Sequence, residues 1–275
     1  MNTELAGKVV LVTGASGGIG SAIVRKFADE GAKLVLHYHR NRAKAIALHH
    51  ELQSNESIVL QADLTKEADV KRLFAQAVKR FGRVDTLVAN AGSWEARDVR
   101  LHKMSLRQWR QTQDNVLTSA FLSLREFLRL VARQKRGNAV LIASTAAVFG
   151  EAGHADYASA KAAMADGLTR SLKNEMARIA PHTAGYCGGR VNCVCPGWTV
   201  MARTAEKLRE AQWVRKVTAT MALPQLARPD DIANAVVFLS SDALARHITG
   251  QTLGVAGRME GRLLWQANET NPALA

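Results

Sequence analysis

Residues 8–20 read KVVLVTGASGGIG and carry the clearest local indication of the chain's architecture. Lys8 to Val12 is a short apolar run rich in β-branched side chains, which predicts a buried strand. The glycines from Gly14 to Gly20 let the backbone approach a phosphate closely, and residues 21–30 carry apolar side chains at helical spacing. A glycine pattern alone is weak evidence, but here a second strand follows at 33–38. The stretch therefore predicts a strand–loop–helix–strand unit whose helix N-terminus faces a dinucleotide pyrophosphate.

The rest of the chain alternates between predicted strands and helices. Further strands are expected at residues 57–61, 84–89, 139–144, 190–195 and 250–255, and further helices at 43–53, 65–81, 114–134 and 157–177. Residues 93–106 look polar and irregular. The alternation predicts an α/β fold: one single-domain, Rossmann-type, doubly wound parallel sheet with helices on both faces. We expect the domain to span residues 1–265, with a substrate lid at about 198–223 and a C-terminal tail at 266–275.

The end of the second predicted strand distinguishes NADP from NAD. An acidic side chain at this point accepts hydrogen bonds from the ribose 2′-hydroxyl of NAD. This chain has no carboxylate there and reads HYHRNR at residues 37–42. The guanidinium fork of Arg40 suits a 2′-phosphate, which predicts NADP(H) as the cofactor. The alternative is that Arg40 is only a residue of a surface loop.

A second stretch, residues 144–161, carries the candidate chemistry. Tyr157 and Lys161 are four residues apart, so they share one face if the segment is helical. A free tyrosine has a pKa near ~10, and a neighbouring ammonium group favours the phenolate and lowers that pKa. Ser144 follows an apolar run, at a strand end from which its hydroxyl can donate to the same carbonyl oxygen. The set predicts proton transfer at a carbonyl oxygen, although most such Tyr–Lys pairs are only neighbours on a helix.

Composition argues against several classes of protein. The net charge is +13, but the positive side chains are scattered, which argues against a nucleic-acid-binding protein. No apolar run approaches the ~20 residues of a membrane span, and the N-terminus does not resemble a signal peptide. The three cysteines, Cys187, Cys193 and Cys195, lack the spacing of zinc or redox motifs. We therefore expect free thiols, no metal site, no membrane or nucleic-acid partner and a cytoplasmic location.

Four features together resemble the short-chain dehydrogenase/reductase family. They are Thr13-Gly14-x-x-x-Gly18-x-Gly20, Asn90-Ala91-Gly92, the Ser144–Tyr157–Lys161 set, and Pro196-Gly197 after the predicted strand at 190–195. They stand in the family's order and spacing, and the resemblance covers residues 7–264. It implies an NADPH-dependent oxidoreductase that transfers a hydride between the nicotinamide and a ketone or secondary alcohol. Such an enzyme is a carbonyl reductase or, in the other direction, an alcohol dehydrogenase.

The resemblance implies a role for each catalytic candidate. Tyr157 would be the general acid in reduction and the general base in oxidation. Lys161 would lower the pKa of Tyr157 and hold the nicotinamide ribose, while Ser144 would orient the substrate oxygen. Asn115 would hold a water that joins Lys161 to solvent and completes a proton relay.

Cofactor contacts are implied at several separate segments. Asp63 would contact the adenine ring, residues 90–92 would pack beside the adenosine and ribose, and Thr199 would meet the nicotinamide amide. The full implied set is Gly14, Ser16, Gly18, Ile19, Gly20, His39, Arg40, Asn41, Asp63, Leu64, Asn90, Ala91, Gly92, Tyr157, Lys161, Pro196, Gly197 and Thr199.

The substrate side is less sharply defined. Trp198, Met201 and Trp213 form a candidate apolar wall in the lid, and Trp94 and Phe149 are candidates for the opposite wall. Nearby basic residues would suit a hydrophobic or anionic small-molecule substrate, but the same residues also suit ordinary packing of a lid. The resemblance further implies a homotetramer, or a homodimer, in which the long helices near 114–134 and 157–177 pair between subunits.

Narrower alternatives stay open. The segment at 37–40 resembles the NADPH-binding segment of pteridine reductases, but those enzymes carry an aspartate where this chain has Ser144, which favours ordinary carbonyl chemistry. The 3-oxoacyl-thioester reductases are similarly close in overall pattern. A non-catalytic, NADP-sensing protein is the alternative from another class. The joint presence of Asn115, Ser144, Tyr157 and Lys161 argues against it, since a sensor needs no proton relay.

Overall fold

The structure is a computed structural model that describes residues 2–52, 56–93, 95, 97–202 and 209–258. Several predictions therefore fall outside the described residues. They concern Trp94, the lid residues 203–208, the domain end at 265 and the tail at 266–275.

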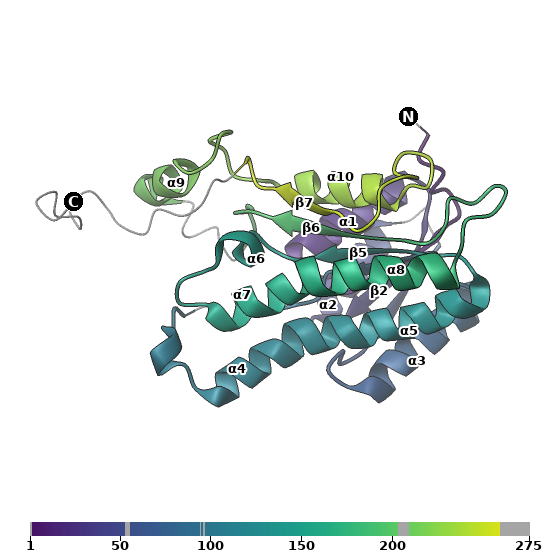
Figure 1. The fold of residues 1–275 in the computed structure, drawn as a ribbon, viewed down its shortest axis with the longest axis horizontal. Coiled ribbons are helices and arrows are strands. Elements are labelled where there is room, and N and C mark those ends of the chain that lie inside the picture. Colours follow the sequence, from purple (N-terminus) through teal and green to yellow (C-terminus); the bar gives the residue numbers. More distant parts are fainter. Residues whose placement is uncertain (1, 53–55, 94, 96, 203–208, 259–275) are drawn as a thin grey trace, which may run out of the picture.

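The described residues form a seven-stranded parallel sheet as the central layer (Figure 1). Its strands run in the order β3-β2-β1-β4-β5-β6-β7, and every pairing is parallel. The order reverses between β1 and β4, which is where ligands bind at the carboxyl ends of strands in such sheets. The predicted doubly wound fold is confirmed. The strands are β1 (Val9–Val12), β2 (Lys33–Tyr38), β3 (Ser57–Gln61), β4 (Thr86–Ala89), β5 (Asn138–Ile142), β6 (Arg190–Pro196) and β7 (Thr252–Val255).

Helices cover both faces of the sheet. Within β1, Val9 and Leu11 pack into the core beneath α3, α5 and α8, whereas Val10 and Val12 pack beneath α1, α2 and α10. This two-sided burial explains why central strands such as β1 read as continuous apolar runs. The helices of the first face are α3 (Glu67–Phe81), α5 (Ser119–Gln134), α7 (Ala155–Ala162) and α8 (Thr169–Ile179), and those of the second are α1 (Gly18–Asp29), α2 (Arg42–Glu51) and α10 (Pro229–Ser240).

One helix boundary differs from the prediction. The helix expected to begin at residue 114 is preceded by α4 (Leu106–Gln113), which starts at the last residue of the segment expected to be irregular. Ser105 caps α4, because its side chain accepts a hydrogen bond from the backbone N–H of Gln108 at 3.2 Å. A π-helical turn, η2 (Asp114–Thr118), joins α4 to α5, and a similar turn, η3 (Ala163–Leu168), joins α7 to α8.

Helix α10 was absent from the prediction. It has Pro229 at its first turn, and the Asp231 side chain accepts from the backbone N–H of Arg228 at 2.7 Å, which is a helix-start signal. Shorter elements complete the described chain: η1 (Leu101–Lys103), α6 (Ala146–Phe149) and α9 (Ala211–Thr218). No helix in the described ranges combines the length and apolarity needed to cross a membrane.

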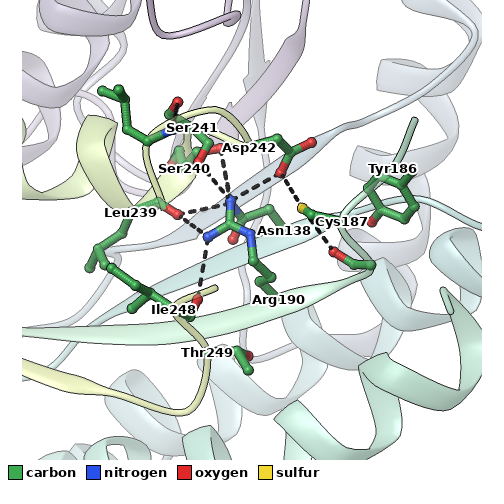
Figure 2. A network of polar contacts seen from close by, with 12 residues as sticks. Asn138, Tyr186, Cys187, Arg190, Leu239, Ser240, Ser241, Asp242, Ile248 and Thr249 are labelled. Atoms are coloured by element: carbon green, nitrogen blue, oxygen red, sulfur yellow. Dashed lines mark hydrogen bonds and ion pairs between the residues drawn. The ribbon is translucent and has the colours of Figure 1, made fainter. Parts of the chain in front are cut away.

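A buried polar network lies at the end of the sheet where β5 and β6 begin (Figure 2). The guanidinium of Arg190 donates to the carbonyl of Leu239 at 2.8 Å and to that of Ser241 at 3.1 Å, and it pairs with Asp242 at 3.0 Å. The amide nitrogen of Asn138 donates to two carbonyls at the same helix end, each at 3.0 Å. These bonds satisfy the C-terminal carbonyls of α10, which otherwise have no partner within the helix.

Candidate active site

The glycine loop between β1 and α1 has no room for side chains at two positions. Gly14 has a φ of +66°, and a Cβ there would lie 3.1 Å from Ala91 Cα. A Cβ at Gly20 would lie 2.2 Å from the carbonyl oxygen of Gly14, which only glycine avoids. Helix α1 starts at Gly18 with Gly17 at its cap, without a capping side chain or a first-turn acid among the described residues. Its positive end is therefore open to an anion.

Thr13 and Asn90 join this loop to the end of β4. The Thr13 hydroxyl accepts from the backbone N–H groups of Asn90 at 2.9 Å and Ala91 at 3.0 Å. The Asn90 side chain in turn donates to the carbonyls of Thr13 at 2.9 Å and Gly14 at 3.2 Å. Two segments that the sequence assigns to the cofactor thus meet at the point where the strand order reverses.

Lys161 is buried beside Tyr157. Its Nζ lies 5.7 Å from the centroid of the Tyr157 ring and donates to the carbonyl of Ile142 at 2.6 Å. Only 4% of Lys161 is exposed, and this burial lowers its pKa from 10.5 to about 8, although the thiols of Cys193 and Cys195 act in the opposite direction. The amine can therefore gain or lose a proton not far from neutral pH. Both of these cysteines, like Cys187, are free thiols, as expected.

Ser144 follows β5 and lies next to the Pro196–Gly197 segment. Its Oγ accepts from the backbone N–H of Ala146 at 3.1 Å, which leaves its own hydrogen for another acceptor. The N–H of Thr145 donates to the carbonyl of Pro196 at 2.9 Å, so the ends of β5 and β6 meet here. A Cβ at Gly197 would lie 2.8 Å from that of Ala256, which keeps this turn close to the segment after β7.

Asn115 lies in the π-helical turn η2 rather than near the start of a regular helix. Its carbonyl accepts from the Ser119 hydroxyl at 2.8 Å. A Cβ at Gly92 would lie 3.7 Å from both Lys161 Nζ and the Val116 side chain of this turn. The turn, Gly92 and Lys161 are therefore neighbours.

The residues expected near the 2′-phosphate follow β2. Arg40 is exposed, and no ion pair of its side chain occurs among the described residues. His39 is also exposed, and Asn41 caps α2 by accepting from the N–H of Lys44 at 3.3 Å. The structure thus gives Asn41 a role in starting a helix.

Asp63 lies just beyond β3 and is ionised. Burial alone would raise the pKa of its carboxyl, but the hydrogen bonds from the hydroxyl and N–H of Thr65, at 2.7 and 3.1 Å, outweigh burial and hold the pKa below its ordinary value. Leu64, also expected at the cofactor, is buried in the core beneath α3 and α5. Ser16 and Ile19 are half-buried in the glycine loop and at the start of α1.

The described residues of the predicted lid make two packing contacts. Trp198 packs edge-on against Trp213 of α9, with ring centroids 5.0 Å apart. The Met201 side chain lies over the glycine loop, because a Cβ at Gly18 would be 3.2 Å from Met201 Cγ. Phe149 is 37% exposed on α6 and is not enclosed with these residues. Thr199 is buried, and its hydroxyl donates to the carbonyl of Gly197 at 3.0 Å.

Sequence reasoning missed a buried carboxylate beside the candidate tyrosine. Asp156 is 1% exposed and accepts from the Thr112 hydroxyl at 2.7 Å and from the backbone N–H of Tyr157 at 2.9 Å. The Gln108 amide also donates to this carboxylate at 3.3 Å, and the Gln113 amide donates to the backbone carbonyl of Asp156 at 2.9 Å. The only local signal was an acidic residue in the first turn of α7, which is common at helix starts. Asp156 fixes the start of α7, and with it Tyr157, against α4.

Comparisons with known proteins find a matching family model and similar sequences. A family model described as enoyl-(acyl carrier protein) reductase matches residues 14–259. A 3-oxoacyl-(acyl-carrier-protein) reductase of Synechocystis sp. is 34% identical over 259 residues, which cover 94% of this chain and 98% of the relative. A protein of the same name from Staphylococcus aureus is 34% identical over 257 residues, covering 92% of this chain and 98% of the relative. With its parallel sheet, its glycine loop and these matches, the chain belongs to the short-chain dehydrogenase/reductase family of oxidoreductases.

Proposed function

We propose that this chain is an NADPH-dependent reductase that converts a ketone into a secondary alcohol, with Tyr157 as the general acid. The observation that carries the proposal is the buried Lys161 amine beside the Tyr157 ring, next to Gly92 and the end of β5. The names of the relatives make a 3-oxoacyl thioester the first substrate class to test.

The residues at the carboxyl edge of the sheet fit a phosphorylated dinucleotide. The uncapped start of α1 offers N–H donors and the positive end of a helix dipole to a pyrophosphate. Arg40 offers a guanidinium to a 2′-phosphate, and Asp63 offers a carboxylate to the adenosine. When bound, NADPH supplies the hydride that attacks the carbonyl carbon, which is chemistry that the protein side chains lack.

Side chains of the protein then supply the proton and bind the carbonyl oxygen of the substrate. The Ser144 hydroxyl donates to the substrate oxygen, and Tyr157 transfers its phenolic proton to that oxygen as charge develops there. The carbonyl thus gains one hydride and one proton and becomes an alcohol. The Lys161 ammonium stabilises the phenolate that remains, and its pKa of about 8 allows it to return a proton. Asn115 would hold a water that links this relay to solvent; its neighbour Val116 and Lys161 Nζ both lie 3.7 Å from the Cβ position of Gly92, which supports this role.

NADPH oxidation tests the proposal directly. The substrates are a 3-oxoacyl thioester, a simple cyclic ketone and a dihydropterin, each with NADPH and with NADH. Tyr157→Phe is expected to bind NADPH normally and to lose at least ~100-fold in kcat. The matched control is Tyr186→Phe, which removes a hydroxyl bonded to Gly137 at the opposite edge of the sheet and should leave kcat unchanged. Normal turnover by Tyr157→Phe would contradict the mechanism, and turnover of the dihydropterin alone would favour a pteridine reductase-like enzyme.

We also propose that the subunits pair through the outer surface of α5 and α8. Phe121 is 45% exposed on α5, and the Arg125 guanidinium lies 5.3 Å from its ring centroid. A large exposed ring beside a cation is typical of an interface residue. Sedimentation analysis of Phe121→Lys is expected to show smaller particles than the wild type, and an unchanged mass would contradict this interface.

A further inference from the structure

We propose that His37 is a positioning residue for the cofactor, because its imidazole fixes the first residue of the glycine loop to the ends of β2 and β3. The inference rests on the proposed dinucleotide binding. It assigns to a buried strand residue a function that the mechanism above does not use.

The ring makes two hydrogen bonds that require a single neutral tautomer. The backbone N–H of Gly14 donates to Nδ1 at 3.0 Å, so Nδ1 carries no hydrogen. Nε2 lies 3.0 Å from the carbonyl oxygen of Ala62, so Nε2 carries the hydrogen and donates it. Only 1% of His37 is exposed, and burial, opposed by the Ala62 carbonyl, lowers its pKa to about 4. The neutral form therefore persists throughout the physiological pH range.

The contact with Gly14 lies beyond the end of the sheet. The pairing of β1 with β2 stops at Val12 and Leu36, and on the other side the N–H of Thr13 still donates to the carbonyl of Val88 in β4 at 3.0 Å, so Gly14 is the first residue after these sheet bonds. His37 makes two hydrogen bonds to the glycine loop. Its ring accepts from the N–H of Gly14, and its backbone carbonyl accepts from the N–H of Ala15 at 2.9 Å. The strands are already paired without the ring, so its contribution falls on the loop rather than on the sheet.

Gly14 in turn sets the start of α1. Its carbonyl accepts from the N–H of Gly17 at 3.1 Å and from the Asn90 side chain at 3.2 Å. Gly20 packs so closely on this carbonyl that a Cβ would lie 2.2 Å from it. A shift of Gly14 would therefore move the N–H groups that face the pyrophosphate.

The other end of the ring reaches the adenine side of the site. Ala62 directly precedes Asp63, and Arg40 follows His37 by three positions. One imidazole thus links the three segments proposed to hold the pyrophosphate, the 2′-phosphate and the adenine. A buried polar bridge of this kind pre-organises a binding site, because the loop does not have to be ordered when the ligand arrives.

Three substitutions separate the two hydrogen bonds. His37→Asn places an acceptor where Nδ1 stands, His37→Gln places a donor where Nε2 stands, and His37→Leu keeps neither. If the Gly14 contact positions the cofactor, the dissociation constant of NADPH should rise roughly tenfold or more in the Leu and Gln variants and only a few-fold in the Asn variant. The KM for NADPH should follow the same order, with a smaller change in kcat.

The control is Asn138→Leu, which removes two buried hydrogen bonds at the opposite edge of the sheet (Figure 2). It should lower the melting temperature without changing NADPH affinity. The proposal is overturned if His37→Leu melts earlier, as the control does, yet binds NADPH like the wild type. Equal affinities of the Asn and Gln variants would also overturn it, even if the Leu variant fails to fold. Failure of the wild type to bind NADPH or NADH would instead remove the proposed function, and this inference with it.

Discussion

Replacing Lys161 with methionine is expected to stabilise the folded chain at neutral pH while it removes turnover. The amine is buried, and water solvates its charge better than this part of the core does, so burial lowers its pKa from 10.5 to about 8. A protonated Lys161 therefore costs folding free energy. Methionine fills a similar volume without a charge, but it loses the hydrogen bond to Ile142.

The structure sets the size of the effect. A pKa drop from 10.5 to about 8 corresponds to roughly 3 kcal/mol. Methionine avoids this cost but loses the hydrogen bond to the Ile142 carbonyl that the neutral amine also makes, worth about 1 kcal/mol, so the variant should be about 2 kcal/mol more stable near pH 7. Because the folded pKa lies below the unfolded value, the unfolded state binds more protons between about pH 8 and 10.5. The stability of the wild type relative to the variant should therefore rise across this window, and the order of the two should reverse.

Urea unfolding of both proteins at a series of pH values measures this difference. Comparing the two cancels other groups that titrate in the same range, such as the cysteines and tyrosines. A difference in unfolding free energy that stays constant from about pH 7 to about 10 would refute the reasoning. So would a variant that is less stable than the wild type by more than ~2 kcal/mol near pH 7, because the hydrogen bond would then outweigh the desolvation of the charge.

Three other substitutions test the loop, the cofactor type and the lid. Gly20→Ala places a Cβ 2.2 Å from the Gly14 carbonyl and should cost about 3 kcal/mol by thermal unfolding, whereas Gly167→Ala, with nothing within 4 Å, should be neutral or slightly stabilising. Arg40→Ala should weaken NADPH binding roughly 10- to 100-fold and leave NADH binding nearly unchanged; equal losses in fluorescence titrations would argue against a 2′-phosphate contact. Trp213→Ala removes a ring packed edge-on against a second lid tryptophan. It should raise the KM of the ketone but not that of NADPH, and a change confined to NADPH would place this helix over the cofactor instead.

The sheet was predictable because its central strands, such as β1, β4 and β5, are buried on both faces and read as largely apolar runs. Helix α4 was not, since its sequence LRQWRQTQ has almost no apolar stripe. It is held instead by the Ser105 cap and by side chains that reach Asp156, a residue far away in the chain. Helix α10 is hard to recognise for the opposite reason: it is apolar on several sides and is buried against α1 and the sheet.

The candidate site follows the same logic. Candidates that belong to a local motif, such as Gly14 and Lys161, could be named from the sequence, because their spacing suggests a binding or proton-transfer role. The part played by His37 could not, because it depends on Gly14 and Ala62, which only the sheet brings to its ring. Likewise, nothing local shows that Asp156 is a buried acceptor, since the hydroxyl of Thr112 reaches it from another helix.

Polar groups are paired differently at the two ends of the sheet. At one end, Arg190 and Asn138 use their donors on the carbonyls that end α10, so the hydrogen bonds there serve the fold (Figure 2). At the other end, α1 starts without a capping side chain in the described chain, and Lys161 is held as a buried amine at a cost in folding free energy. An open helix end and a desolvated charge do not stabilise the fold, which favours the proposed roles of this end in anion binding and proton transfer. Substitutions at the Arg190 end alone are therefore expected to lower stability without lowering cofactor affinity. Only substitutions at the α1 end are expected to lower cofactor affinity without lowering stability.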